Sequence, residues 1–464
     1  MKHGNGKVSG LKIAYIGGGS RGWAWTLMSD LMQADDIEGT VHLYDIDKQA
    51  ALDNQIIGRM YNDVEGAKSH WEYEVFDTLG DALKGVDFVI ISILPATLEE
   101  MQSDVHAPEK YGIYQSVGDT TGAGGILRSL RTAPMFEVIA KAIKENCPNA
   151  WVINYTNPMT LCVKTLYRIF PQIKAFGCCH EVFGTMKFLA KILKNFYGVQ
   201  GDIPREDIKV NVLGINHFTW LTSAKYKNID IFDVYKQFCI EHPEGTPPAC
   251  EDNWMNAGTN SNLVKMDLFK RYGYIAAAGD RHLAEFCPAE WYLNDEKTIK
   301  AWEYKLTSVE WRKKAIETHR KEESEKFISR EKALELRPSG EDGVNQIRAI
   351  LGLHEMITNV NLPNIGQIPN LPLGAVVETN AIFRSGEVTP VFAGNIPKSI
   401  YAMVAHILGE QEALDEAIAQ RDLEKAFSVF ATDPQMKLSL NDARALFDEM
   451  VENTKKYLGE YFHN

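Results

Sequence analysis

The stretch "LKIAYIGGGSRGWAWTLM", residues 11–28, decides how the first part of this chain folds. Residues 11–16 form a short apolar run with β-branched and aromatic members that stops at three glycines, which is typical of a buried parallel strand. Beyond the glycines, apolar residues recur at helical spacing from Ala24 to Leu31. The pattern predicts a strand, a glycine-rich turn and a helix in direct succession.

Similar apolar runs follow along the chain, and helical segments separate them. This alternation predicts an α/β fold in which residues 1–200 form a Rossmann-like, doubly wound parallel sheet. Residues 201–464 are predicted to form a mainly helical α+β domain packed on that sheet, with residues 310–336 as a solvated, salt-bridged helical face. The further strands are predicted at residues 40–47, 86–95, 149–158 and 173–180, with one helix between the first two and another over 159–170.

Length and composition narrow the class of protein. The chain has 464 residues, which favours two domains, and its 45% hydrophobic and 24% charged residues are ordinary for a folded, soluble protein. A net charge of −13 argues against nucleic acid or membrane surfaces as partners. There is no signal-peptide pattern and no apolar run long enough to span a membrane, so we expect a cytoplasmic protein.

The glycine-rich turn fits the pattern GxGxxG of dinucleotide-binding folds. Its first glycine permits the tight turn, its second lets a pyrophosphate approach the backbone, and its third lets the helix meet the strand. An acidic residue at the end of the next strand would accept hydrogen bonds from the adenosine ribose and repel a 2′-phosphate, which favours NAD over NADP. The predicted NAD-binding residues here are Gly17, Gly19, Ser20, Gly22 and Asp45.

The stretch "GCCHEVFG", residues 177–184, places two cysteines beside a histidine and a glutamate at the end of a predicted strand. Open α/β sheets bind ligands at this edge. "GINHFTWL", residues 214–221, adds His217 after another strand-like run. A thiolate and an imidazole can hold a divalent transition metal, but packed cysteines and structural histidines look the same in a sequence. On the residues alone, packing, redox chemistry, nucleophilic catalysis and metal binding all stay open.

Five blocks of the sequence, in this order, resemble the signature blocks of glycoside hydrolase family 4, the NAD- and metal-dependent glycosidases. They are "IAYIGGGS", "GDTTGAGGILRSLRTAP", "NYTNPMT", "GCCHEVFG" and "GINHFTW". The resemblance runs from about residue 11 to "VVETNA" near residue 380, and within the family it is strongest to the bacterial α-galacturonidases, which act on pectin fragments.

The resemblance implies a glycosidase mechanism without the usual pair of carboxylates. NAD⁺ takes hydride from C3 of the sugar, a base removes the acidified C2 proton, the glycosidic oxygen leaves, water adds, and NADH returns the hydride. A divalent metal, Mn²⁺ by resemblance, stabilises the intermediate charge. The resemblance also implies a second domain arranged as in lactate and malate dehydrogenases, and a homodimer or homotetramer.

Carried over position by position, the resemblance assigns the metal to Cys179 and His217, and leaves Cys178 to packing. It assigns substrate binding to Asn157 and places Asn154 close to the cofactor. The acid and base are predicted among His180, Asp119, Tyr272, Asp280 and His282. Of these, His180 replaces the acidic residue that follows the ligand cysteine in the 6-phosphoglucosidase branch.

A uronate substrate also needs a cation for its carboxylate, because the chain as a whole is acidic. The guanidinium fork of Arg281, Arg131 or Arg128 is predicted to supply it. The function predicted from all of this is NAD- and Mn²⁺-dependent hydrolysis of α-galacturonides. The alternatives are another α-glycosidase of the same family (an α-glucuronidase or α-galactosidase), an NAD-dependent 2-hydroxy-acid dehydrogenase, and a non-catalytic NAD-binding regulator.

Overall fold

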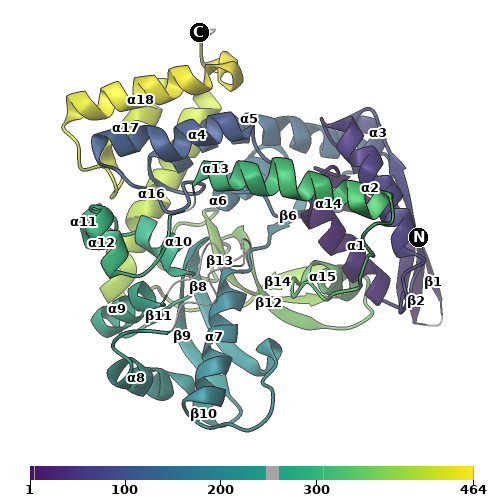
Figure 1. The fold of residues 1–464 in the computed structure, drawn as a ribbon, viewed down its shortest axis with the longest axis horizontal. Helices are drawn as coiled ribbons and strands as arrows, with labels where there is room; N and C mark the ends of the chain where they lie inside the picture. The colour runs from purple at the N-terminus through teal and green to yellow at the C-terminus, as the bar shows by residue number, and fades with distance from the viewer. Residues whose placement is uncertain (5, 247–260, 307, 463–464) are drawn as a thin grey trace.

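A computed structural model describes residues 1–464 except residues 5, 247–260, 307 and 463–464 (Figure 1). Its main sheet carries the predicted strands. The elements of the first part are β1 (Lys2–Gly4), β2 (Lys7–Ile16), α1 (Trp23–Gln33), β3 (Ile37–Tyr44), α2 (Lys48–Tyr61), β4 (Trp71–Val75), α3 (Leu79–Leu83), β5 (Phe88–Ile91), α4 (Leu98–His106), α5 (Gly122–Asn146), β6 (Trp151–Asn154), α6 (Met159–Ile169), β7 (Lys174–Gly177) and α7 (Glu181–Asn195).

Six of these strands run parallel, in the order β7-β6-β5-β2-β3-β4. This is the doubly wound order in which the chain first builds outward from β2 to β4 and then returns to the other side through β5. The predicted Rossmann-like fold is therefore confirmed. The switch point lies between β2 and β5, and ligands of such sheets bind outside the carboxyl ends of the strands there.

The strand β4 was missed, because the region between the second and third predicted strands was interpreted as helical only. Its sequence, WEYEV, alternates buried Trp71 and Tyr73 with exposed glutamates and so lacks a continuous apolar run. β4 lies at the edge of the sheet, where one face meets solvent and such alternation is expected.

The second half of the chain extends the same sheet. β12 (Met356–Pro363) pairs antiparallel with β7 and with β13 (Val376–Arg384), which pairs with β14 (Glu387–Pro390). The register sets Asn361 opposite Gly177, so β12 passes the "GCCHEVFG" stretch. The division of the chain near residue 200 stays a prediction, and the main sheet continues across it.

A smaller antiparallel sheet and many helices complete the second half. The remaining elements are β8 (Ile208–Ile215), β9 (Phe218–Tyr226), β10 (Ile229–Asp230), α8 (Ile231–Glu241), α9 (Leu263–Tyr272), β11 (Ile275–Ala276), α10 (Asp280–Glu285), α11 (Ala289–Tyr292), α12 (Glu296–Ala301), α13 (Val309–Lys313), α14 (Lys321–Ile328), α15 (Gly343–Ile350), α16 (Lys398–Gln420), α17 (Leu423–Thr432) and α18 (Leu440–Thr454). Among the described helices, none combines the length and the apolar composition that crossing a bilayer requires.

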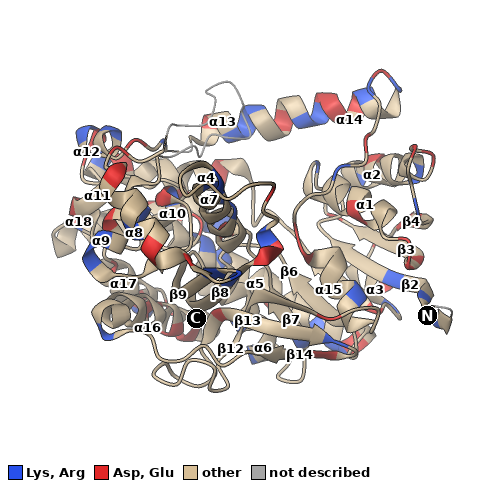
Figure 2. Ribbon diagram, turned by 90° about the horizontal axis from the view of Figure 1, so that it is seen from below, with Lys and Arg blue, Asp and Glu red and all other residues tan. Residues whose placement is uncertain are grey.

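Helices α13 and α14 are joined by a π-helical stretch, Lys314–Arg320, and run as one long helix across the molecule (Figure 1). Charges of both signs follow one another along it (Figure 2), as predicted for a solvated face. The helix also has a buried side, since Phe327 packs edge-on against Trp25 of α1 with ring centroids 5.3 Å apart. It ends at Ile328, short of the predicted helical face, which extended to residue 336.

Candidate active site

The glycine-rich turn connects β2 to α1 as predicted, and its backbone explains the glycines. Gly17 has φ of 93°, and a Cβ there would lie 2.0 Å from the Ser92 carbonyl oxygen. Gly22, the N-cap of α1, has φ of 135° and no side chain to cap the helix. The first N–H groups of α1 therefore face the turn and suit an anion such as a pyrophosphate.

Asp45 lies directly beside this turn. Its Oδ2 accepts a hydrogen bond from the Gly19 N–H at 2.8 Å and its Oδ1 accepts one from the Asp47 N–H at 2.9 Å. Burial raises the pKa of this carboxyl. A carboxylate accepts up to four hydrogen bonds, so the two bonds leave capacity for ribose hydroxyls. Ser20 stays within the turn, its N–H donating to the Gly17 carbonyl at 3.0 Å.

Asn154, predicted to lie close to the cofactor, is instead occupied by its own loop. Its side-chain amide donates to the Thr156 carbonyl at 3.0 Å and contacts the Met159 sulfur, and its Oδ1 accepts from the Thr156 N–H at 3.0 Å. The side chain is fully buried. These contacts shape the loop that carries Asn157, and the predicted closeness of Asn154 to the cofactor stays a prediction.

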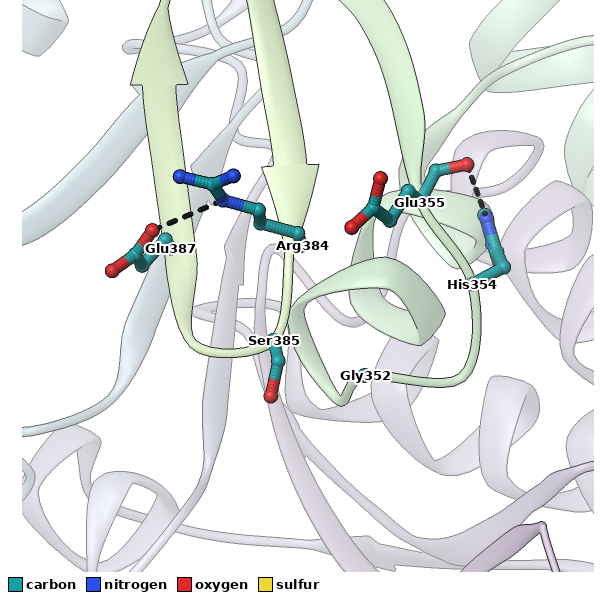
Figure 3. A pocket seen from close by; sticks show the side chains of 6 residues that line it. All are labelled: Gly352, His354, Glu355, Arg384, Ser385 and Glu387. Atoms are coloured by element: carbon teal, nitrogen blue, oxygen red, sulfur yellow. Dashed lines mark hydrogen bonds and ion pairs between the residues drawn. The ribbon is translucent and has the colours of Figure 1, made fainter.

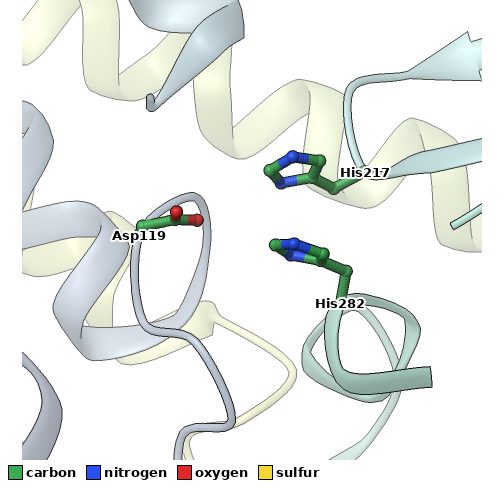
Figure 4. A group of neighbouring side chains, drawn as sticks. All are labelled: Asp119, His217 and His282. Carbon is green, nitrogen blue, oxygen red and sulfur yellow. The ribbon is translucent and has the colours of Figure 1, made fainter. Parts of the chain in front are cut away.

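Asp119, His217 and His282 converge in one cluster, with a ligand atom of each within 4.8 Å of the others (Figure 4). Asp119 lies in the loop before α5, His217 in the two-residue turn between β8 and β9, and His282 on α10. The two imidazole rings stack with centroids 3.8 Å apart. His217 adopts a left-handed backbone with φ of 63°, a conformation uncommon outside glycine, which aims its ring from the tip of the turn.

Thr120 links two members of the cluster and fixes the state of one of them. Its hydroxyl donates to Asp119 Oδ1 at 2.8 Å, and its Oγ1 lies 2.9 Å from His217 Nδ1. Because a hydroxyl has only one proton to donate, Nδ1 of His217 must carry the hydrogen of the second bond. This tautomer leaves the lone pair of Nε2 available for a metal ion.

The charges of the cluster also suit a cation. Burial, together with neighbouring His282, lowers the pKa of His217 to about 3, so the ring is neutral near pH 7. Burial opposes ionisation of Asp119, but the positive charges of His217 and His282 when they are protonated, and of Arg128, outweigh it and hold the pKa of Asp119 below the usual range. A carboxylate and two imidazoles form a donor set for a divalent transition metal.

Glu181 is a candidate site residue that the sequence analysis missed. Its carboxylate accepts the Gly279 N–H at 2.6 Å, and its Oε1 lies 3.7 Å from Nε2 of His282 and 3.9 Å from Nε2 of His180. Burial opposes its ionisation, yet these imidazoles, His282 first, hold its pKa well below the usual range. Glu181 belongs to the stretch "GCCHEVFG" that the sequence already singled out. Nothing in the sequence indicated that the side chains of two histidines would lie beside its carboxylate.

His180 lies at the rim of this site rather than inside it. Its side chain is 53% exposed, its ring stacks on Trp23 of α1 at 6.1 Å, and its Nδ1 lies 3.3 Å from Glu341. The hydrogen bond with Glu341 raises the pKa of His180 to about 9. The residue is therefore protonated near neutral pH and lies between the glycine-rich turn and Glu181.

The two adjacent cysteines have different surroundings. Cys178 packs against the sheet core and its Sγ lies 3.1 Å from Gln346 Oε1, as expected for a packing residue. Cys179 is buried beside Asn216 and Glu378, and burial raises the pKa of its thiol. The metal-compatible cluster contains His217 but not Cys179, so the pairing of Cys179 with His217 on one ion stays a prediction. Cys250 lies outside the described residues.

Two of the predicted acid–base candidates, Tyr272 and Asp280, make contacts outside the cluster. Tyr272 ends α9 and packs against Trp220, with ring centroids 6.1 Å apart. Asp280 accepts the N–H groups of Val264 at 3.2 Å and Lys265 at 3.0 Å, so it caps the start of α9. The contacts shown for both residues are structural ones, their catalytic roles stay predictions, and Glu181 joins them as a further candidate.

Of the arginines predicted to bind the substrate carboxylate, Arg131 is already paired with an acidic residue of the protein. It forms a fully buried, two-pronged ion pair with Asp104, whose Oδ1 lies 3.0 Å from Nη1. Arg131 is therefore structural, which corrects its predicted role in substrate binding. Arg281 lies at the cluster and donates to the Ser116 carbonyl at 3.0 Å, while Arg128 donates to the Asn157 carbonyl at 3.2 Å.

Asn157 faces the cluster as the resemblance implied for a substrate-binding residue. Its side-chain amide donates to Asp119 Oδ2 at 3.3 Å, while its buried Oδ1 has no partner within the described ranges. Nδ1 of His282 is also buried and has no hydrogen-bond partner among the described residues. Buried polar atoms left open at one place are a mark of a ligand site.

A shallow pocket elsewhere on the surface does not belong to this site (Figure 3). It lies between the β13–β14 turn and the loop after α15, and its polar residues partly satisfy one another, Arg384 donating to Glu387 at 3.2 Å. Its lining residues are Gly352, His354, Glu355, Arg384, Ser385 and Glu387.

Comparison with known proteins identifies relatives of this chain. A protein of Thermoanaerobacterium saccharolyticum named alpha-galacturonidase is 57% identical over 99% of this chain and 98% of its own length. The crystal structure of LplD from Bacillus subtilis, by its name a presumed glucosidase, is 46% identical with a TM-score of 0.89, covering 96% of this chain and all of that one. The 6-phospho-beta glucosidase of Thermotoga maritima, solved with manganese, NAD+ and glucose-6-phosphate, shares the fold at 22% identity and a TM-score of 0.76, covering 96% of this chain and 99% of that one.

The family models agree as well. The model "Family 4 glycosyl hydrolase" matches residues 12–195, and the model of the C-terminal domain of the same family matches residues 212–436. Together they cover most of the chain, and the chain belongs to glycoside hydrolase family 4.

Proposed function

We propose that this protein hydrolyses α-galacturonides with the help of NAD and a divalent metal ion such as Mn²⁺. The observation that carries the proposal is the full-length identity of 57% to a protein named alpha-galacturonidase, combined with a dinucleotide turn and a metal-compatible cluster at neighbouring places in one site. The substrate would come from pectin fragments in the cytoplasm, and the working form would be a homodimer or homotetramer.

The residues present fit the two cofactors. The glycine-rich turn and Asp45 would hold NAD, and His217 with Asp119, His282 and the nearby Cys179 would hold the metal ion. When bound, NAD supplies a hydride acceptor, and the ion polarises the sugar oxygens that it ligates.

The chain itself supplies groups for proton transfer. Protonated His180 at the rim is suited to donate a proton to the departing glycosidic oxygen, and the Glu181 carboxylate, between His180 and His282, is suited to accept one. The role given to Glu181 rests on its position between the two imidazoles, since its lowered pKa keeps it ionised and makes it a weak base. Asn157, with its open Oδ1, would orient a sugar hydroxyl.

A panel of aryl α-glycosides tests the function. Galacturonide, glucuronide, galactoside and 6-phosphoglucoside are assayed with Mn²⁺, NAD⁺ and a thiol reductant. We expect the galacturonide to be cleaved fastest, without net NADH, and activity to vanish on removal of metal and NAD and to return when both are added. Turnover that survives complete removal of both would contradict the proposal, and steady NADH accumulation would favour the dehydrogenase alternative.

A further inference from the structure

Three arginines surround the Asp119 loop, and each has a buried guanidinium nitrogen without a hydrogen-bond partner among the described residues. They are Arg128 of α5 (Nη1), Arg281 of α10 (Nε) and Arg312 of α13 (Nε). A buried donor without a partner is costly, since a guanidinium that leaves water needs its hydrogen bonds replaced. Three such donors around one site indicate an anionic ligand.

The three arginines differ in what already holds them. Nε of Arg128 donates to the Asn157 carbonyl, which directs this residue toward the sheet edge. Nη2 of Arg281 donates to the Ser116 carbonyl, and its Nε stays open. Arg312 lies on α13, at the start of the long helix, and its charge acts on Asp119, Arg281 and Glu285. Arg281 and Arg312 are thus two cations that both act on Asp119.

The acids that face this pair, Asp119, Glu181 and Glu285, do not neutralise it. Asp119 is shared with the histidines and Arg128, and Glu181 with His180 and His282. Glu285 is fully buried, its Oε1 accepts the N–H groups of Val117 and Gly118 at 2.7 and 2.9 Å, and its Oε2 is unpaired within the described ranges. Burial raises its pKa to about 7, so at neutral pH it gives only part of a negative charge. A local positive surplus remains in a protein whose net charge is −13.

We propose that Arg312, acting with Arg281, clamps the C6 carboxylate of the sugar, so that helix α13 sets the preference for acidic over neutral substrates. A carboxylate presents two oxygens in a plane and fits the fork of a guanidinium, which explains arginine rather than lysine at these positions. The inference rests on the proposed function, and it adds a residue that lies in none of the five sequence blocks.

Calorimetry on the protein loaded with NAD⁺ and Mn²⁺ tests the clamp with D-galacturonate, D-galactose and D-galactose 6-phosphate. We expect Arg312→Ala to weaken galacturonate binding by about 30-fold, as for loss of a charge-assisted hydrogen-bonded pair, and to weaken galactose binding by less than about 3-fold. Arg312→Lys keeps the charge without the fork and should fall between. Lys314→Ala, an exposed cation on the same helix, is the matched control and should bind all three sugars as the wild type does.

These measurements can contradict the carboxylate clamp without contradicting the proposed function. Equal weakening of galacturonate and galactose in Arg312→Ala, with an unchanged melting temperature, would overturn the clamp. Tighter wild-type binding of galactose 6-phosphate than of galacturonate would overturn the assignment to a carboxylate. If the wild type cleaves no galacturonide at all, the proposed function fails first, whatever Arg312 does.

Discussion

The glycine-rich turn and the Asp119–His217–His282 cluster lie at neighbouring places in the site, yet they are built in opposite ways. The turn comes from one continuous stretch, and its partner Asp45 directly follows the next strand, β3. The cluster joins a loop before α5, a turn between two strands of the smaller sheet, and a short helix. A dinucleotide turn can therefore be recognised in one stretch of sequence. The residues of the cluster come together only in the folded protein.

Removing a member of the cluster should give the largest effect. We expect His217→Ala to lower kcat/KM for an aryl α-galacturonide by about 10³-fold or more, because Lewis-acid stabilisation contributes several kcal/mol. The Kd for NAD should stay within about 3-fold, since the turn is built independently. Fluorescence titration with NADH measures the second quantity. His406→Ala, an exposed histidine on α16, serves as the control, and a matching loss there would break the comparison.

Thr120 tests whether the cluster depends on its supporting contacts. Thr120→Val removes the hydroxyl that bonds both Asp119 and His217 while keeping the shape of the side chain. The loss should weaken Mn²⁺ binding by about 10- to 100-fold, as for other outer contacts of metal ligands. Mn²⁺ titration followed by electron paramagnetic resonance measures it. Unchanged affinity would mean that the tautomer of His217 is fixed by something else.

Asp45 gives the converse test in the turn. Asp45→Asn keeps the acceptor for the Gly19 N–H but loses charge, and it should weaken NAD binding by about 10-fold with metal affinity unchanged. NADP should bind the variant better than it binds the wild type, because the repulsion of its 2′-phosphate is gone. A parallel loss of Mn²⁺ affinity would show that the two regions are not separable.

The smallest effect is expected at Tyr272. Because its ring packs on Trp220, Tyr272→Phe should change kcat by less than about 2-fold. A pH–rate profile of wild type and variant makes the comparison. A loss of 100-fold or more would identify the tyrosine as a base and displace Glu181 from that role.

What sequence could predict follows the same division. The strands, the glycine turn and Asp45 were predictable because apolar runs and glycine spacing report local backbone needs. β4 was not predicted, because an edge strand with one solvent-exposed face has no continuous apolar run. Arg131 was assigned to the substrate because a sequence does not show that Asp104 already pairs with it. Glu181 and Arg312 were not singled out because the groups that they face, such as His282 and Asp119, come from distant segments.

The most direct test of the account is the stoichiometry and location of the metal. Titration of Mn²⁺ into the metal-free wild type, followed by electron paramagnetic resonance, should show one tight site per chain. We expect His217→Ala and Asp119→Asn each to abolish this site and His406→Ala to retain it. Tight binding of one Mn²⁺ per chain in both cluster variants would contradict it.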